Sequence, residues 1–341
     1  MSTTRPRRVL LITYPRTASN LLVKILSLDD QTNIQSSRLG GYFFSAVPKV
    51  THELNIWDKH INQWAPGDRD RIWQCIADGV KELEKTVCKG EADGKILFVK
   101  DHIQCLLEPT AQAKFVYGED EIKETPWQWD ITSAYDPQQA SLNDTVLPDQ
   151  YLRLWMPIFL IRHPALAFPS FCRVHLERKG SEDPYGGRDR WLSIFMTLHW
   201  SRRLYDWYTT LYSNETEHTS DPQETATWPI ILDADDIISE PRIVERLAGI
   251  IGMDVTKLKF SWAPATAEEM EKMTPLARRM LSTLSASDGI QEHNSAAHID
   301  IDEEAKKWRE EFGESKGQRL EEWVRAAMPD YEFLKDRRMR P

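Results

Sequence analysis

Short apolar segments alternate with helix-like stretches along this chain, and this alternation limits the possible folds more than any other feature. Each segment is short and rich in β-forming residues, which favours a buried strand over a buried helix. Strands alternating with helices predict a mainly parallel central sheet flanked by helices in three layers, an α/β fold. The four predicted strands are 8–13 (RVLLIT), 96–99 (ILFV), 157–161 (PIFLI) and 228–232 (WPIIL).

Helical periodicity fills much of the sequence between these strands. The clearest end signals belong to one helix that has Pro241 in its first turn and stops at Gly252, because proline suits a helix start and glycine a helix end. Helices are also predicted from about 19 and 165 onward, and over 67–88, 188–212, 266–284 and 302–326.

The length of 341 residues suits one large α/β domain. We therefore expect a single domain over 1–341. Residues 116–150 are polar and irregular, with Pro126, Pro137 and Pro148. A loop of this length is usually functional or mobile, so this stretch is predicted to be a long loop or insertion within the domain. Residues 213–227 are predicted to form a shorter surface loop.

The formal net charge is −10, and the sequence shows no basic face. Proteins that grip nucleic acid or a polyanionic glycan usually carry one, so we expect no nucleic-acid partner. No apolar run approaches the ~20 residues of a membrane span, and the N-terminal MSTTRPRR lacks a signal-peptide pattern. We therefore expect a cytoplasmic protein without a membrane partner.

The spacing of the cysteines also favours a cytoplasmic location. Cys75, Cys88, Cys105 and Cys172 form no CxxC pair and no metal-like cluster. Free thiols in a reducing compartment are the expected state, and no metal is predicted.

The loop after the first strand is a candidate anion site. It lacks the glycines and the Lys-Ser/Thr pair of a Walker A motif, which argues against a nucleotide kinase. Arg16 stands beside the hydrogen-bonding residues Thr17, Ser19 and Asn20, at a helix N-terminus where the dipole favours an anion. An ordinary N-cap formed by Thr17 or Ser19 explains the same residues equally well.

A second candidate anion site follows the third strand. Arg162 ends that strand, and Ser170 lies eight residues later on the predicted helix, so the two can converge on one phosphate. Taken alone, a structural arginine paired with a carboxylate is the simpler interpretation.

His102 lies just past the second predicted strand, at the sheet edge where α/β proteins bind their ligands. Histidine can take a proton from a hydroxyl near neutral pH, although a lone histidine is more often structural. Of the other histidines, His163 is expected to act as a cap and His199 to pack in the core.

These three segments together resemble the motifs of the sulfotransferase superfamily that uses 3′-phosphoadenosine-5′-phosphosulfate (PAPS). Thr13 to Leu21 (TYPRTASNL) matches T-Y-P-K/R-S-G-T-T-W/L in register, and Arg162 with Ser170 matches R-x(7)-S. Lys100 and His102 match a K-T-H element between them. The departures are Ala18 for glycine, Asn20 for a hydroxyl residue, Asp101 for threonine and Leu166 for aspartate.

The resemblance implies a P-loop NTPase-like sulfotransferase fold, of the soluble small-molecule type, with PAPS as co-substrate and 3′,5′-ADP as product. It assigns Arg162 and Ser170 to the 3′-phosphate, His102 to the general base, and Lys100 with Arg16 to charge stabilisation. The loop residues that it assigns to the 5′-phosphate are Arg16, Thr17, Ala18, Ser19 and Asn20.

One element of the family is missing. Its R-K-G loop should lie just upstream of Trp308, where this chain has the acidic stretch 298–302 (HIDID). Either the 3′-phosphate is held more weakly than in the family, or Lys306, Lys307 or other cations supply the missing charge. A lost cofactor role is the alternative: a diverged activity such as dehydration, or a nucleotide-binding module without catalysis.

The acceptor is expected to be a small hydroxylated molecule. Five of the thirteen tryptophans lie in 30–95 and 116–150, which the motifs leave unexplained. Aromatic side chains there favour an aromatic or apolar acceptor, and core packing explains them equally well. They are Trp57, Trp64, Trp73, Trp127 and Trp129.

Overall fold

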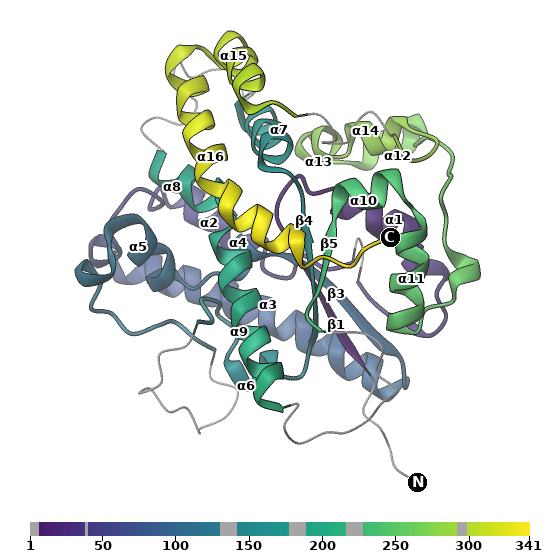
Figure 1. Ribbon diagram of the computed structural model, residues 1–341. Helices are drawn as coiled ribbons and strands as arrows, with labels where there is room; N and C mark the ends of the chain where they lie inside the picture. Colours follow the sequence, from purple (N-terminus) through teal and green to yellow (C-terminus); the bar gives the residue numbers. More distant parts are fainter. Residues whose placement is uncertain (1–6, 38–39, 130–141, 177–188, 216–227, 292–298) are drawn as a thin grey trace. The chain divides into compact units, whose positions relative to one another are not determined.

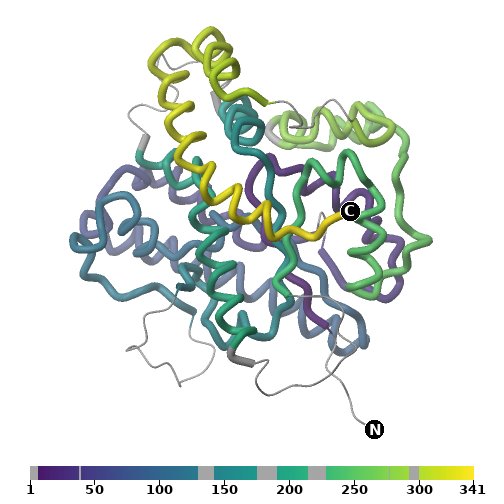
Figure 2. The backbone as a smooth tube through the Cα atoms, in the orientation of Figure 1, coloured from purple at the N-terminus to yellow at the C-terminus, as the bar shows by residue number. Residues whose placement is uncertain are grey.

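The structure, a computed structural model (Figures 1 and 2), describes residues 7–37, 40–129, 142–176, 189–215, 228–291 and 299–341. Its five strands form a parallel sheet in the order β2–β3–β1–β4–β5. Helices flank this sheet, and the predicted α/β class is confirmed. The strands are β1 (Arg8–Thr13), β2 (Ile34–Gln35), β3 (Ile96–His102), β4 (Met156–Ile161) and β5 (Ile230–Asp233).

The pairing of β1 with β3 positions the candidate base. The ladder runs in parallel register from Arg8 opposite Leu97 to Thr13 opposite His102. Because parallel strands end at the same edge of a sheet, Thr13 and His102 share the carboxyl edge, where ligands of α/β proteins bind. The remaining β1 side chains from Val9 to Ile12 are buried.

Two features of the sheet differ from the sequence prediction. β2 is a fifth strand of two residues, too short to leave a periodic pattern. β3 extends three residues beyond the predicted 96–99, so that Lys100 and His102 belong to the strand itself. Polar residues therefore continue a strand whose apolar part alone was recognisable.

The chain divides into two compact units, each built from several stretches. The first unit comprises 1–14, 33–159 and 187–230. In it α3 (Pro66–Ala92) packs against β2, β3 and α2 (Ala46–Glu53) through a buried stripe at helical spacing that includes Ile72, Ile76 and Val80. The unit also contains α4 (Ile103–Leu106), α5 (Pro109–Tyr117), α6 (Asp149–Leu152), α8 (Asp189–Phe195) and α9 (His199–Glu215).

The second unit comprises 15–32, 160–186 and 231–341. Here α1 (Ser19–Leu26) packs against α11 (Arg242–Ile251), and α7 (Pro164–Leu176) packs against α13, α15 and α16. As predicted, α11 follows Pro241 and ends at Gly252, which has φ 94. The other helices are α10 (Ala234–Ser239), α12 (Ala267–Lys272), α13 (Pro275–Met280), α14 (Ser282–Ala286), α15 (Ile301–Phe312) and α16 (Glu314–Asp336).

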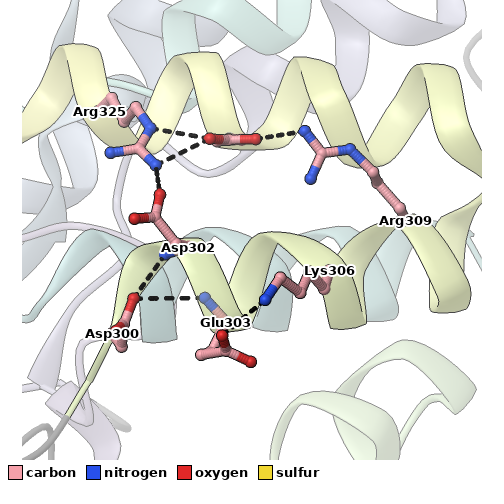
Figure 3. A network of polar contacts seen from close by, with 7 residues as sticks. Asp300, Asp302, Glu303, Lys306, Arg309 and Arg325 are labelled. Atoms are coloured by element: carbon pink, nitrogen blue, oxygen red, sulfur yellow. Dashed lines mark hydrogen bonds and ion pairs between the residues drawn. The ribbon is translucent and has the colours of Figure 1, made fainter.

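Three predicted helices are broken into shorter ones. The stretch 188–212 forms α8 and α9, and 266–284 forms α12, α13 and α14. The stretch 302–326 divides at Gly313, whose φ of 86 ends α15 before α16 begins. Figure 3 shows the polar network that joins these two helices: Arg325 pairs with Asp302, and Glu321 accepts from Arg309 and Arg325.

Part of the predicted loop 116–150 lies outside the described residues, namely 130–141. The residues before and after 130–141 are joined by a hydrogen bond, in which the backbone N–H of Trp129 donates to the backbone oxygen of Val146 at 2.9 Å. Of the predicted loop 213–227, residues 216–227 also lie outside the described residues. The single-domain and insertion assignments stay predictions.

Candidate active site

The loop between β1 and α1 adopts a left-handed backbone conformation twice without glycine. Arg16 has φ 71 and Ala18 has φ 58. Ala18 is the N-cap of α1 and makes no side-chain capping bond, so the interpretation of Thr17 or Ser19 as an ordinary N-cap is wrong. A left-handed L-residue costs about 1–2 kcal/mol, and strain of this kind clusters at functional sites.

The two predicted phosphate motifs meet within the second unit. Arg16 Nε donates to Ser170 Oγ at 2.9 Å, and Arg162 donates to the backbone oxygen of Arg16 at 3.0 Å. Arg16 also donates to the backbone oxygen of Met280, on α13, at 2.8 Å. The loop after β1 and the segment after β4 are thus joined through the side chains that the family resemblance singles out. Thr17 and Ser19 of the same loop are buried, and Asn20 is half-buried in the first turn of α1.

Carboxylates lie close to Arg162. Burial lowers the pKa of its guanidinium, while the charges of Asp235 and Asp233 raise it. Asp233 accepts from Tyr331 Oη at 2.8 Å and from the backbone of Asp235 at 3.0 Å, and burial raises its pKa to about 6. This surrounding suits a structural arginine as well as a phosphate-binding one.

The acidic stretch upstream of Trp308 serves the helix that follows it. Asp300 accepts from the backbone of Asp302 and caps α15, and His298 lies outside the described residues. Lys306 and Lys307 pair with Glu303 and Glu304 on their own helix, each at 2.6 Å. These two lysines are therefore already matched by local carboxylates.

The end of β3 carries the predicted base within the first unit. Since side chains alternate along a strand, Lys100 and His102 share one face and Asp101 lies on the other. The His102 ring contacts Thr13, its partner across the ladder, with 2.6 Å between Nδ1 and Oγ1. Thr13 Oγ1 also lies 3.1 Å from the backbone oxygen of Asp101.

Lys100 and Asp101 are both buried, which the sequence did not predict. Burial lowers the pKa of Lys100 to about 7 and raises the pKa of Asp101 to about 7. Asp101 accepts from the backbone of Phe44 at 3.2 Å and of His102 at 2.8 Å. The Asp101 carboxylate therefore ties the segment around residue 44 to the end of β3.

A turn before α2 presses against this strand, and sequence reasoning missed it. Tyr42 N donates to Lys100 O at 2.9 Å, and the Tyr42 ring lies 4.4 Å from Lys100 Nζ and 5.1 Å from the His102 ring. A Cβ on Gly41 would lie 2.0 Å from Lys100 O, so only glycine fits. The Gly-Gly pair before an aromatic residue was the signal that could have found this turn.

Gln104, two residues after His102, is a second unpredicted feature. Its side chain is 2% exposed, and neither of its amide atoms has a hydrogen-bond partner. A buried polar group without a partner costs about 1–3 kcal/mol. A buried water or a ligand group usually satisfies such an amide.

Two further histidines that the sequence singled out, His163 and His199, contact the backbone or neighbouring rings, and His199 is half-buried rather than part of the buried core. His163 Nδ1 accepts from the backbone of Ala165 at 3.1 Å, and burial lowers its pKa to about 4. His199 packs against the rings of Phe115 and Trp200 at centroid distances of 5.2 and 5.0 Å.

Four of the five tryptophans noted in the sequence gather in one cluster of the first unit. Trp73 stacks on Trp129 at 5.6 Å and meets Trp127 edge-on at 6.2 Å, and Trp127 in turn meets Trp64. Trp64 and Trp127 also pack on the buried side chains of Ile61, Ala113 and Ile122. Core packing therefore accounts for part of this cluster.

The described residues contain no group of three or more side chains that could hold a metal ion. Within the same residues, no helix is long and apolar enough to cross a membrane. All four cysteines are free thiols.

Comparisons with known proteins identify the family. The chain is 40% identical to a protein named sulfotransferase ppzF from Metarhizium rileyi (strain RCEF 4871), over 98% of this chain and 97% of the relative. It is 39% identical to a sulfotransferase ppzF from Metarhizium majus (strain ARSEF 297), over 99% of this chain and 98% of the relative. Identity at this level over nearly the full length shows that the chain belongs to the sulfotransferase family.

The sulfotransferase domain of the Synechococcus PCC 7002 olefin synthase resembles the chain with a TM-score of 0.38 and 12% identity, over 90% of this chain and 96% of that domain. No protein family model matches the chain. Family membership makes the protein a sulfotransferase, an enzyme that transfers a sulfuryl group to an acceptor, rather than a dehydratase or a silent binding module.

Proposed function

We propose that this sulfotransferase takes its sulfuryl group from PAPS and transfers it to a hydroxyl of a small aromatic or apolar acceptor. The observation that carries the proposal is the junction of the two phosphate motifs, with Arg16 Nε 2.9 Å from Ser170 Oγ and Arg162 bonded to the backbone of Arg16. Two cations and a hydroxyl in one junction suit a nucleotide that carries more than one phosphate.

In this proposal Arg16 and the loop residues Thr17, Ala18, Ser19 and Asn20 hold the 5′-phosphosulfate, and Arg162 with Ser170 holds the 3′-phosphate. Backbone N–H groups at the start of α1 and the helix dipole add to the attraction for the anion. The same grip retains the product 3′,5′-ADP until release.

His102 acts as the general base. It removes the proton of the acceptor hydroxyl as that oxygen forms a bond to sulfur. The bond between sulfur and the 5′-phosphate oxygen breaks at the same time, and its electron pair leaves with 3′,5′-ADP. A base in this position contributes typically ~10²–10⁴-fold to the rate.

Lys100 and Arg16 stabilise the negative charge on the transferring group and the leaving phosphate. Lys100 sits in a buried, low-dielectric position beside the Tyr42 ring, where a charge acts more strongly than in water. Preorganised donors of this kind are each worth about 2.7–4 kcal/mol of the barrier.

Chain connectivity supports a common role for the base and the phosphate loop. Thr13 contacts His102, and only Tyr14 and Pro15 separate it from Arg16. The acceptor class rests on the aromatic content of the first unit, where Trp73, Trp127 and Trp129 form a partly exposed cluster.

Nucleotide binding is the first test. Thermal unfolding is followed with 3′,5′-ADP, 5′-ADP, AMP and ATP-Mg, each at about 100 times the dissociation constant for 3′,5′-ADP, where a specific ligand stabilises by ~2.7 kcal/mol. We expect 3′,5′-ADP to raise the midpoint most. Arg162→Ala should remove that shift, and Arg173→Ala, which changes an arginine on α7 that pairs with Glu311, should keep it. A preference for ATP-Mg would refute the assignment of PAPS.

Transfer is the second test. His102→Ala should reduce sulfuryl transfer to a phenolic test acceptor by about 10²–10⁴-fold, while the thermal shift with 3′,5′-ADP remains. His60→Ala, which changes a histidine elsewhere in the first unit, is the matched control and should transfer normally. Loss of both transfer and nucleotide binding in His102→Ala would mean that His102 is structural.

A further inference from the structure

We propose that Thr13 is a positioning residue that fixes His102 in the tautomer with its proton on Nδ1 and its lone pair on Nε2. The inference rests on the proposed function of His102 as the base. Its spectroscopic test reads the proton on the ring itself, and therefore it stands or falls separately from catalysis.

Strand register brings the two residues together. Thr13 ends β1 and His102 ends β3, and the parallel ladder places them opposite each other. Thr13 is 1% exposed, so water does not compete for its hydroxyl. The two positions are fixed by a ladder of six paired residues, which holds the contact more rigidly than a surface loop would.

The hydroxyl of Thr13 has two neighbours and one hydrogen. Its Oγ1 lies 3.1 Å from the backbone oxygen of Asp101 and 2.6 Å from Nδ1 of His102. A carbonyl oxygen can only accept, whereas Nδ1 can donate or accept, so both contacts are hydrogen bonds only when the hydroxyl hydrogen goes to Asp101. The contact with the ring then requires Nδ1 to donate to a lone pair of Oγ1.

This arrangement decides which ring nitrogen can act. In a neutral imidazole one nitrogen carries the hydrogen and the other the lone pair. With the hydrogen on Nδ1, Nε2 carries the lone pair and can accept a proton. In the opposite tautomer Nε2 carries a hydrogen and cannot. The backbone oxygen of Asp101 thus sets the state of the base through Thr13.

The family resemblance includes Thr13 in the matched segment but assigns it no role. The Tyr42 ring also meets the His102 ring edge-on, at a centroid distance of 5.1 Å. That contact is between ring edges and does not involve the Nδ1 hydrogen, which lies toward the Thr13 hydroxyl.

Nitrogen NMR tests the tautomer directly. The full-length protein is labelled with ¹⁵N-histidine and observed at alkaline pH, where imidazole is neutral, and the His102 signals are those lost in His102→Ala. We expect the wild type to show a protonated Nδ1 and an unprotonated Nε2. Thr13→Val, which removes the hydroxyl and keeps the shape, should shift the population toward a protonated Nε2. A protonated Nε2 in the wild type would overturn the proposal.

Kinetics provides the second readout. Thr13→Val should lower kcat on the order of tenfold, a part of the ~10²–10⁴-fold that a general base supplies, with KM for PAPS unchanged. Thr13→Ser keeps the hydroxyl and should restore both the rate and the wild-type tautomer. If Thr13 had only a structural role, Thr13→Ser and Thr13→Val would give the same ¹⁵N spectrum for the His102 ring.

The outcomes separate the two hypotheses. If Thr13→Val changes the tautomer and His102→Ala still transfers sulfate, the positioning is correct and the base assignment is wrong. If Thr13→Val keeps the tautomer but weakens the binding of 3′,5′-ADP, Thr13 acts through the phosphate loop, and the positioning role is refuted.

Discussion

At positions 16 and 18 the backbone after β1 enters the left-handed region that most side chains avoid. The sequence marked Ala18 as a departure from the family, because a glycine there would move more freely. The structure shows that alanine adopts the conformation anyway and that α1 starts from it. The Arg16 side chain of this loop is hydrogen-bonded to Ser170 and to the backbone of Met280.

Substitution at Ala18 should show this strain. Ala18→Gly relieves about 1–2 kcal/mol of left-handed strain and adds about 0.5–1 kcal/mol of chain entropy cost. We expect a gain in the free energy of unfolding of at most about 1.5 kcal/mol in urea titrations. Ala18→Val places a β-branched residue at positive φ and should lose both stability and the thermal shift with 3′,5′-ADP. Equal stability of the valine and glycine variants would contradict the strained conformation.

Residue patterns singled out Arg16, Arg162 and Ser170 better than the surroundings of His102. These three residues are joined by hydrogen bonds within the second unit, and each of their motifs is local to one strand end. Thr13 and Tyr42 were missed, since their contacts with His102 depend on strand register and on a turn sixty residues away. A pattern read within one short segment contains no information about contacts between residues that are far apart in the sequence.

The turn at Gly40, Gly41 and Tyr42 is the element that most depends on close packing. Gly41 forms a parallel β-bridge with Lys100. The backbone φ of Tyr42 is 70, a conformation that is uncommon for a bulky residue. The turn therefore couples the path of the chain before α2 to the end of β3.

Adding one methyl group should disturb this coupling. In Gly41→Ala the new Cβ meets the backbone oxygen of Lys100, and we expect a loss of about 1–3 kcal/mol in unfolding free energy together with slower transfer. Gly67→Ala, near the start of α3 where the added Cβ meets nothing within 4 Å, is the control. Identical unfolding curves and rates for the two variants would show that the turn tolerates displacement.

At the level of elements, apolar strands and the glycine-ended α11 were predictable, and short pieces were not. β2 has two residues, and α12 to α14 are separated by one or two residues each. Their boundaries follow from caps such as the Thr266–Glu269 capping box and Thr274 before Pro275. The helical periodicity of a longer window does not register such caps, and it therefore predicted one helix where the structure has three.

For the whole molecule, the two compact units are interleaved in sequence, because the chain passes between them several times. The protein is acidic, with net charge −10. Two of its cations nevertheless lie together, because Arg16 and Arg162 come from two separate stretches of the second unit and are hydrogen-bonded there. The free cysteines are spread over both units: Cys75, Cys88 and Cys105 in the first and Cys172 in the second.

Thiol reactivity should follow this distribution. Cys88 is exposed and Cys75 is half-buried, whereas Cys105 and Cys172 are buried. Burial raises the pKa of Cys172 to about 12 and that of Cys105 well above its usual value. In a native titration with a thiol reagent we expect Cys88 to react first, and all four to react after denaturation. A native Cys88→Ser protein that still reacts at the fast rate would contradict this order.

The conformation at Ala18 also bears on how related proteins can be recognised. In this loop the main chain reaches a φ of 58 at a residue with a side chain, so glycine is not required for this conformation. A search written in residue letters discards chains that follow this path with a costlier side chain, whereas a search written in dihedral angles would retain them.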